Sequence, residues 1–236
     1  MSRGLKTGLL TLNKPHMTTN PFIFILLLLP WSAAAKQQAS QPMVYDEKAT
    51  EILQQASEVL AGYPELKVTF VYTMENPRFS EKESMDGTLY ASGDKYHMKL
   101  GDNLFISDGE VAWTFLGEVN EVHISLVEHS QGSITPTSLL RDFQEDYRPR
   151  WISEEDHQGA RMHVIDLFPE QPEAFYKYRT GICTRNFHLV YITAHDRQGG
   201  NYTYQITGMK PEPGIPTELF TFDPGLYPGI EVVDLR

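Results

Sequence analysis

The chain of 236 residues has a single cysteine, Cys183. One thiol cannot form an internal disulfide or supply a cysteine-rich metal site, so Cys183 is expected to be a small buried residue. Catalytic patterns are also missing. The histidines form no H-x-x-x-H or H-E-x-x-H pair, and there is no G-x-S-x-G elbow, P-loop or dinucleotide-binding glycine cluster. These absences predict a protein that is not an enzyme, with no metal site and no cofactor.

Basic residues are scarce as well. The chain has 20 Lys and Arg against 31 Asp and Glu, a net charge of −11. Three of the basic residues, Arg3, Lys6 and Lys14, lie in the first 35 residues, which contain no acidic residue. Residues 36–236 therefore hold 17 basic and 31 acidic residues, a net charge of −14. Such a surface repels nucleic acid and anionic headgroups, so neither is an expected partner.

The chain also lacks a long hydrophobic run. Its most apolar stretch, "FIFILLLL" at 22–29, is too short for a bilayer, which takes about 20 helical residues. Basic residues precede it and "PWSAAA" follows, a pattern typical of a secretory signal peptide cleaved near Ala35. We expect a cleaved signal at 1–35, a flexible leader at 36–43 and one domain at 44–236. A buried core helix is the alternative, but the small and polar residues that follow fit it poorly. No cysteine follows the run to carry a lipid, so the product should be a soluble periplasmic protein.

A single helical pattern opens the domain. In "EKATEILQQASEVLAGYP" the apolar residues recur at helical spacing, Asp46 can cap the start, and Gly62 and Pro64 end the helix. A second helix is expected in "TPTSLLRDFQ" (135–144), where Pro136 suits a first-turn position.

Most of the remaining chain alternates with a period of two, which indicates strands. Such runs lie at 66–74, 85–91, 95–100, 104–107, 111–116, 119–127, 148–153, 160–168, 175–182, 187–195, 201–208 and 229–235. Asp86-Gly87, Gly93-Asp94, Gly101-Asp102, Asp108-Gly109 and Gly199-Gly200 are expected turns. The pattern predicts a mainly β (α+β) domain with one antiparallel, meander-like sheet and two helices.

Asp108 is the carboxylate with the most apolar surroundings, in "LFISDGEVAWTF". Asp-Gly between two apolar strands favours a two-residue hairpin turn in which both central residues have positive φ. This gives Asp108 a sufficient structural explanation without catalysis.

The width of the sheet raises the question of a cavity. About ten strands at roughly 4.8 Å spacing make a sheet on the order of 50 Å wide, which should curl. Two helices of about 10 Å diameter cover only part of its apolar face. Either the interior is filled by its own side chains, or a hydrophobic hollow remains. The residues alone leave both alternatives open.

Four stretches resemble the outer-membrane lipoprotein carrier family, LolA. They are "DGTLYASGDKYHMKL" (86–100), "LFISDGEVAWTFLGEVNEVHI" (104–124), "TPTSLL" (135–140) and "FTFDPGLYPGIEVVDLR" (220–236). The order and spacing of these motifs carry the resemblance, which weakens between 147 and 210.

The resemblance implies an incomplete β-barrel of about eleven strands, covered by helices that act as a lid over a lipid-binding cavity. Tyr96, Met98 and Leu100 would face inward, and Leu139 and Leu140 would lie on the lid. The full expected lining is Leu66, Val68, Phe70, Tyr72, Leu89, Tyr96, Met98, Leu100, Ile106, Trp113, Phe115, Ile124, Leu139, Leu140 and Phe143.

The implied function is a monomeric periplasmic carrier that shuttles lipoproteins from the inner to the outer membrane. Its partners would be acylated lipoproteins, an ATP-driven lipoprotein-releasing transporter of the inner membrane, and an outer-membrane acceptor where one exists. The family often has a lid-latching Arg where this chain has Gly93-Asp94, which leaves Lys95 and Lys99 as candidates for that role. The alternative is a lipid- or lipoprotein-binding sensor or regulatory module on the same scaffold.

Overall fold

The computed structural model describes residues 46–78, 81–127, 143, 146–157, 159–171 and 174–236. All of them belong to one unit of the chain, Met43–Arg236. The expected signal peptide and leader, and Leu139 and Leu140 of the expected second helix, lie outside these residues. Within them the protein is mainly β, with helix α1, the short 3-10 helices η2 and η3, and twelve strands.

Helix α1 spans Glu47–Ala61 and has the predicted ends. The Asp46 carboxylate accepts a hydrogen bond from Ala49 N at 3.1 Å, which satisfies one free N–H of the first turn. Its second oxygen accepts from Trp151 N at 2.8 Å. The same side chain therefore caps the helix and fixes its start to a strand far along the sequence.

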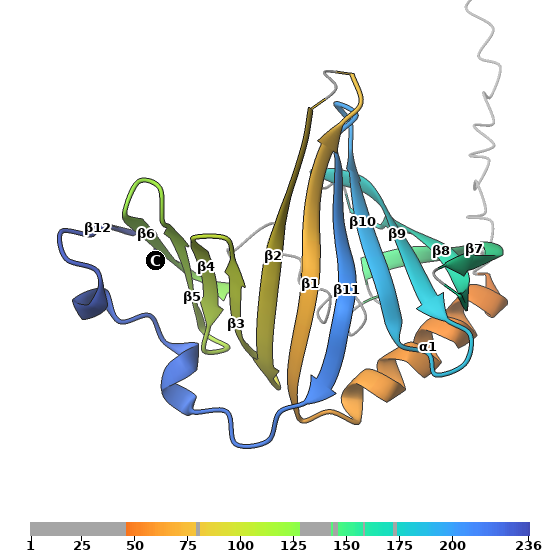
Figure 1. Cartoon of the computed structure of the whole chain (residues 1–236), viewed down its shortest axis with the longest axis horizontal. Coiled ribbons are helices and arrows are strands. Elements are labelled where there is room, and N and C mark those ends of the chain that lie inside the picture. Colours follow the sequence, from red (N-terminus) through yellow and green to blue (C-terminus); the bar gives the residue numbers. More distant parts are fainter. Residues whose placement is uncertain (1–45, 79–80, 128–142, 144–145, 158, 172–173) are drawn as a thin grey trace, which may run out of the picture. The chain divides into compact units, whose positions relative to one another are not determined.

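The strands form one sheet in the order β12-β6-β5-β4-β3-β2-β1-β11-β10-β9-β8-β7, coloured along the sequence in Figure 1. All neighbours are antiparallel except β12 and β6, which are parallel. The strands are β1 (Glu65–Asn76), β2 (Glu81–Ser92), β3 (Lys95–Leu100), β4 (Asn103–Ser107), β5 (Val111–Leu116), β6 (Glu121–Leu126), β7 (Tyr147–His157), β8 (Ala160–Pro169), β9 (Phe175–Cys183), β10 (Leu189–Asp196), β11 (Asn201–Pro211) and β12 (Glu231–Asp234). The described sheet has one strand more than the resemblance implies, and it ends at β12 and β7 without closing.

Four of the five expected turns are confirmed, and two details differ. Gly93, Gly101, Gly109 and Gly199 have positive φ in turns between strands. Asp86-Gly87, in contrast, lies inside β2, where Gly87 pairs with Phe70. Asp108 does not have the positive φ that we expected of it; its carboxylate accepts from Glu110 N at 2.9 Å and Val111 N at 2.8 Å. Asp108 is a turn residue, as predicted, but it holds the turn through its side chain.

Pairing register separates the two faces of the sheet, because directly paired residues point to the same side. We call the side of Leu66, Val68 and Phe70 the inner face, and the side of Lys67, Thr69 and Val71 the outer face. Val68 pairs with Leu89, Leu89 with Met98, and Met98 with Phe105, so all four are on the inner face.

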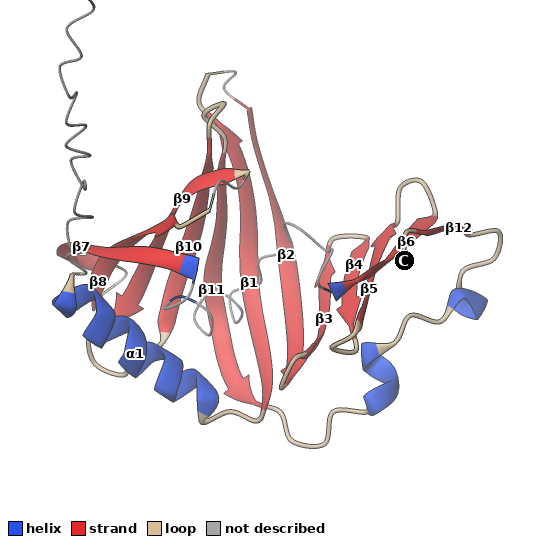
Figure 2. Cartoon of the chain, turned by 180° about the vertical axis from the view of Figure 1, so that it is seen from behind, coloured by secondary structure: helices blue, strands red, loops and turns tan. Residues whose placement is uncertain are grey.

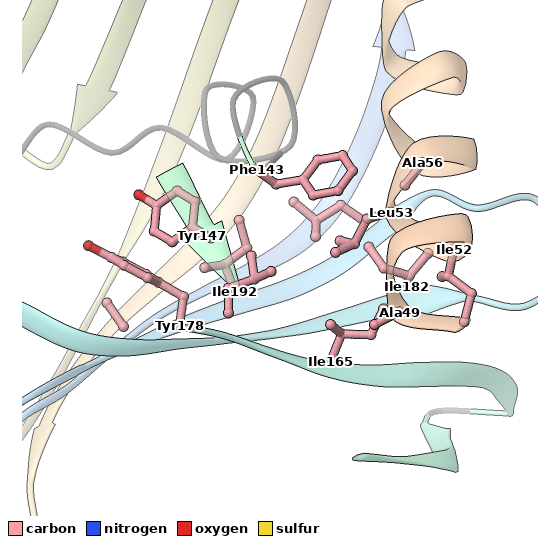
Figure 3. Close-up of a cluster of buried hydrophobic side chains, with 13 residues drawn as sticks. Ala49, Ile52, Leu53, Ala56, Phe143, Tyr147, Ile165, Tyr178, Ile182 and Ile192 are labelled. Atoms are coloured by element: carbon pink, nitrogen blue, oxygen red, sulfur yellow. The ribbon is translucent and has the colours of Figure 1, made fainter. Parts of the chain in front are cut away.

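Helix α1 covers the inner face over strands β7–β10. Ala49, Ile52, Leu53 and Ala56 pack into a buried cluster with apolar residues of these strands, and Figure 3 shows Leu53 and Ile182 meeting there. Figure 2 shows the helix crossing this end of the sheet from behind. Leu53 and Ile165 are fully buried, so this half of the inner face is a solid core.

From β4 to β6 the clustered apolar side chains lie mainly on the outer face, not on the inner face. Ile106 pairs with Trp113, and Trp113 pairs with Ile124, on the outer face. The segment after β11, with short helices η2 (Thr217–Phe220) and η3 (Pro224–Leu226), covers this region before β12. Its Phe222 stacks on Tyr227, with ring centroids 5.0 Å apart, and Phe222 packs on Phe115 at 5.6 Å. The sheet therefore buries apolar side chains on opposite faces in different regions.

Candidate ligand-binding face

A partly open pocket of about 400 Å³ lies between the last turns of α1 and the adjacent ends of β1 and β2. Its volume falls within the range of roughly 300–1,000 Å³ that small-ligand sites occupy. Most of its lining is apolar. The lining residues are Ser57, Leu60, Ala61, Tyr63, Pro64, Leu66, Ala91, Gly93 and Asp94.

The pocket adjoins an apolar wall on the inner face of β1–β3. Leu66 belongs to both, and Leu60 and Tyr63 of the pocket pack on the same cluster. The buried residues of the wall are Leu66, Val68, Phe70, Leu89, Met98 and Leu100. Pocket and wall together form the candidate binding face, whose mostly apolar side chains suit a hydrocarbon ligand.

The expected cavity residues divide into three groups. Leu66, Val68, Phe70, Tyr72, Leu89, Tyr96, Met98 and Leu100 are on the wall or packed against it. Phe143 is buried in the cluster under α1. Ile106, Trp113, Phe115 and Ile124 lie on the outer face, and Ile106, Trp113 and Phe115 belong to the cluster under the C-terminal segment. The register turns the side chains of this last group away from the inner face, so they do not lie on the same surface as the wall.

Several residues of the candidate face were not in the sequence-based lining. Leu60 and Tyr63 come from the end of α1 and the turn after it, whereas Met85, Phe105, Tyr204, Ile206 and Met209 come from strands. The alternation of β11 already placed Tyr204 and Ile206 on one face, but the sequence did not indicate that β11 pairs with β1.

The proposed replacements for the latching Arg do not point toward the pocket. Lys95 and Lys99 are exposed. Their side chains lie on the outer face of β3, whereas the side chain of Met98 lies on the inner face. A different contact holds the pocket end of α1: the Tyr63 hydroxyl is 3.2 Å from Nε2 of His188. Cys183, expected to be buried, is half-buried.

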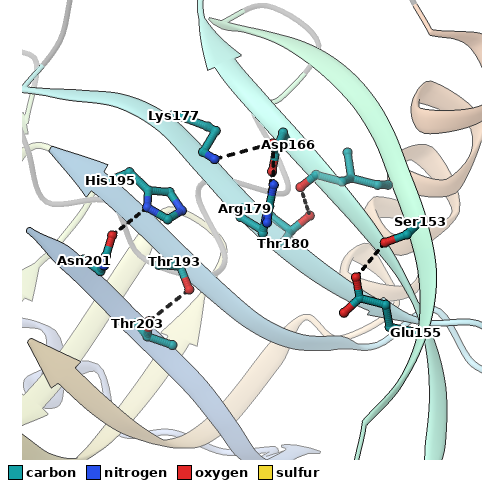
Figure 4. Close-up of polar contacts among 11 residues, drawn as sticks. Ser153, Glu155, Asp166, Lys177, Arg179, Thr180, Thr193, His195, Asn201 and Thr203 are labelled. Carbon is teal, nitrogen blue, oxygen red and sulfur yellow. Dashed lines mark hydrogen bonds and ion pairs between the residues drawn. The ribbon is translucent and has the colours of Figure 1, made fainter. Parts of the chain in front are cut away.

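The main polar network is on the outer face, over β7–β11 (Figure 4). The buried Asp166 accepts two hydrogen bonds from Arg179, at 2.6 and 2.9 Å, and Lys177 Nζ is 3.6 Å away. The hydrogen bond to Asp166 raises the pKa of Arg179, against a smaller lowering by burial. These charges neutralise one another in a bidentate pair, which is a structural arrangement rather than a reactive one.

Within the ranges described above, no three His, Cys, Asp or Glu side chains are grouped in a way that could hold a metal ion. In the same ranges, no helix has the length and hydropathy needed to span a membrane.

No protein-family model matches the sequence, and no curated protein is similar to it in sequence. Among solved structures, an uncharacterized conserved protein from Thermus thermophilus superposes with a TM-score of 0.54 at 14% identity, over 79% of this chain and 99% of that one. A putative outer membrane lipoprotein-sorting protein domain from Vibrio parahaemolyticus gives 0.47 at 13% identity, over 73% and 96%. A LolA superfamily protein from Nitrosomonas europaea gives 0.42 at 15% identity, over 74% and 98%. The likeness to the Thermus thermophilus protein shows a shared fold and nothing about a ligand.

Proposed function

We propose that this chain is a periplasmic carrier that binds the acyl chains of lipoproteins on the candidate binding face and shuttles them toward the outer membrane. The observation that carries the proposal is the partly open pocket of about 400 Å³ that leads onto a wall of buried apolar side chains. The export-type N-terminus and the motifs that resemble LolA support it. An inner-membrane transporter and an outer-membrane acceptor are the partners that this function requires.

Partial burial of an acyl chain suits reversible binding. Each methylene removed from water contributes about 0.8 kcal/mol, so about eight of them contribute on the order of 6 kcal/mol. Burial of several complete chains would make release too slow for a carrier. We therefore expect partial burial of the chains, with additional contacts formed only when side chains on the wall are uncovered.

The test is to express the full chain with its own N-terminus, purify it from the envelope fraction without detergent, and identify bound lipid and acylated protein by mass spectrometry. We expect acylated material with the wild type. Ala91→Phe, which fills the pocket, should remove most of it, and so should Met98→Glu, which places a charge on the wall.

Each variant has a matched control one residue further along the same strand and on the other face: Ser92→Phe for Ala91→Phe, and Lys99→Glu for Met98→Glu. Both controls should keep the bound material. Circular dichroism establishes that every variant is folded. Wild-type protein that carries neither lipid nor acylated protein would contradict the carrier function, and equal loss in variants and controls would contradict the assigned face.

A further inference from the structure

Exposed apolar side chains are concentrated at the end of the sheet formed by β6 and β12. Among the described residues, eight large hydrophobic side chains are exposed, and five of them lie in β12 or in the segments that lead into or out of β6 and β12. These five are Val119, Val127, Leu226, Val232 and Leu235. Figure 1 shows β12 as the last strand at this end of the sheet. Apolar side chains that gather at one edge indicate an interaction surface.

The backbone of β12 has an open edge in the described part of the chain. In a parallel pair, alternate residues of a strand direct their backbone groups to the same neighbour. The amides of Glu231 and Leu235 donate to carbonyl oxygens in or next to β6, at 3.0 and 2.8 Å. Val232 and Asp234 therefore direct their N–H and C=O groups away from β6. Within the described residues no other strand lies beside β12, so these groups are open to a further strand.

The charge around this edge is negative. Glu231 at the start of β12 is directly paired with Glu121 on β6, and Glu118 lies in the turn before β6. Glu118 and Glu231 are exposed, and neither forms an ion pair with another described residue. The Asp234 carboxylate, in contrast, is 2.6 Å from the guanidinium of Arg236, which neutralises it. The start of the edge therefore has an excess of carboxylates.

These features favour an extended segment of a partner protein over a second copy of this chain. A strand added to an open edge completes its backbone hydrogen bonds, and its side chains alternate between the two faces. Val232 presents an apolar side chain on the outer face and Glu231 a carboxylate on the inner face. A segment with alternating apolar and basic residues is complementary to both. A second copy would bring the same carboxylates together, in a chain whose net charge is −11.

We propose that β12 is a docking edge for an extended segment of a partner protein in which apolar and basic side chains alternate. The segment bonds to the backbone of Val232 and Asp234. It places an apolar side chain beside Val232 and a basic side chain beside Glu231. The pocket lies elsewhere, at α1, β1 and β2, so this inference goes beyond lipid binding and does not depend on it.

The experiment measures the binding of labelled synthetic peptides to the full chain by fluorescence anisotropy. The basic probe is a short peptide of alternating Lys and Val. One comparison peptide has Glu in place of each Lys. A second keeps Lys and Val but has methylated amide nitrogens, which removes its backbone donors. We expect the wild type to bind the basic probe about tenfold or more tightly than either comparison peptide, because both the charge and the backbone pairing contribute.

Two substitutions test the edge itself. Val232→Pro removes an N–H on the open side of β12, where an edge strand accommodates proline. Glu231→Lys reverses the charge at the start of the strand. Each should weaken binding of the basic probe about tenfold. Glu83→Lys makes the same charge change at an exposed position of β2 and is the matched control, which should keep the binding. Hydrogen exchange of the Leu235 amide should stay as slow in Val232→Pro as in the wild type, which shows that β12 still pairs with β6.

Three results would overturn the docking edge. Equal binding of the basic probe and its methylated form would exclude strand addition, and this comparison holds even if Val232→Pro releases β12. Unchanged binding in Glu231→Lys, or no binding of the basic probe at millimolar concentration, would exclude a basic segment as the occupant. A wild-type dimer in sedimentation that Val232→Pro dissociates would assign the edge to a second copy. None of these results bears on lipid binding, so the carrier function is tested separately.

Discussion

Phe70 and Gly87 illustrate how a single missing side chain shapes the binding face. The two residues are paired on β1 and β2, and the Phe70 ring lies over the Gly87 backbone. A Cβ at Gly87 would be 2.2 Å from the ring atoms Cε2 and Cζ of Phe70. Gly87 is therefore explained by this close approach, since it lies within a strand and not in the turn that its Asp-Gly sequence indicated.

Gly87→Ala should destabilise the protein by about 1–3 kcal/mol, because the Phe70 ring is buried and cannot move freely. Urea unfolding followed by circular dichroism measures this change. In a Phe70→Leu background the same substitution should cost much less, since the smaller side chain leaves room. An equal cost in both backgrounds would place the strain elsewhere.

Two half-buried histidines, each with one buried ring nitrogen, also affect stability at the residue scale. Nδ1 of His97 and Nε2 of His195 are buried and have no hydrogen-bond partner in the described part of the chain. Burial lowers the pKa of both, Lys99 lowers that of His97 further, and Lys177 and Arg179 act in the same direction on His195. In the folded protein these two imidazoles therefore bind a proton less readily than they do in the unfolded chain.

This difference predicts the direction of a pH effect on stability. Unfolded histidines bind a proton near pH 6.5, whereas these two do so at lower pH in the folded protein. The contribution of these two histidines to the free energy of unfolding should be fully present above about pH 6.5 and should be lost progressively as the pH falls below it. Urea midpoints at pH 7.5, 6.0 and 5.0 measure it, and a His97→Gln/His195→Gln variant should have a flatter profile. A profile as steep as that of the wild type would exclude these residues as the cause.

At the scale of elements, α1 depends on one carboxylate for its position. Asp46 accepts from Ala49 N at the helix start and from Trp151 N on β7. Lys48 adds a cation–π contact, with Nζ 3.5 Å from the centroid of the Trp151 ring. The start of the helix is thereby fixed to one end of the sheet.

Asp46→Ala should lower the free energy of unfolding by about 2 kcal/mol, because it removes a cap and leaves the Trp151 N–H without its acceptor. Asp46→Asn has one side-chain oxygen and should lose about half as much. Thermal and urea unfolding measure both. Equal losses for Ala and Asn would show that the carboxylate charge matters more than its two hydrogen bonds.

The C-terminal segment is the second element with a testable role. Phe222 and Tyr227 pack over Phe115, and β12 then pairs with β6, next to a bond from Glu231 N to Asn120 O at 3.0 Å. Phe222→Ala should release β12 locally, since the stack anchors the segment just before it. Hydrogen exchange of the Glu231 and Leu235 amides should accelerate by about 10- to 100-fold, with β8 amides unchanged. Uniform acceleration would instead indicate global destabilisation.

At the scale of the whole molecule, substitutions on the two apolar faces should have different effects: those on the outer face should change stability, and those in the pocket should change lipid affinity. Trp113→Ala removes outer-face packing and should lower stability by about 3 kcal/mol without changing affinity for a monoacylglycerol. Ala91→Phe in the pocket should reduce that affinity at least tenfold with little loss of stability. Unfolding curves and displacement of a fluorescent fatty probe measure the two quantities. Weaker lipid binding in Trp113→Ala would mean that the outer face contributes to the site.

The sequence by itself determined the local structure. Alternation of apolar and polar residues placed the strands, a helical repeat with Asp46 and Gly62 placed α1, and four glycine-containing pairs marked the turns. These features follow from the chain's own periodicity and backbone preferences, so they need no knowledge of distant partners. The wall on β1–β3 was predictable for the same reason, because each of these strands has one consistently apolar side.

Only the tertiary structure decided which face each strand presents to which partner. In "NLFIS" of β4, Leu104, Phe105 and Ile106 are all apolar, so alternation cannot assign a side, and the pairing register puts Phe105 on the inner face and the other two outside. A one-residue shift would reverse the assignment. The pocket likewise joins the end of α1 to the turn between β2 and β3. Tyr72 on β1 pairs with Tyr204 on β11. Both arrangements bring together segments that are far apart in the sequence, so local patterns could not predict them.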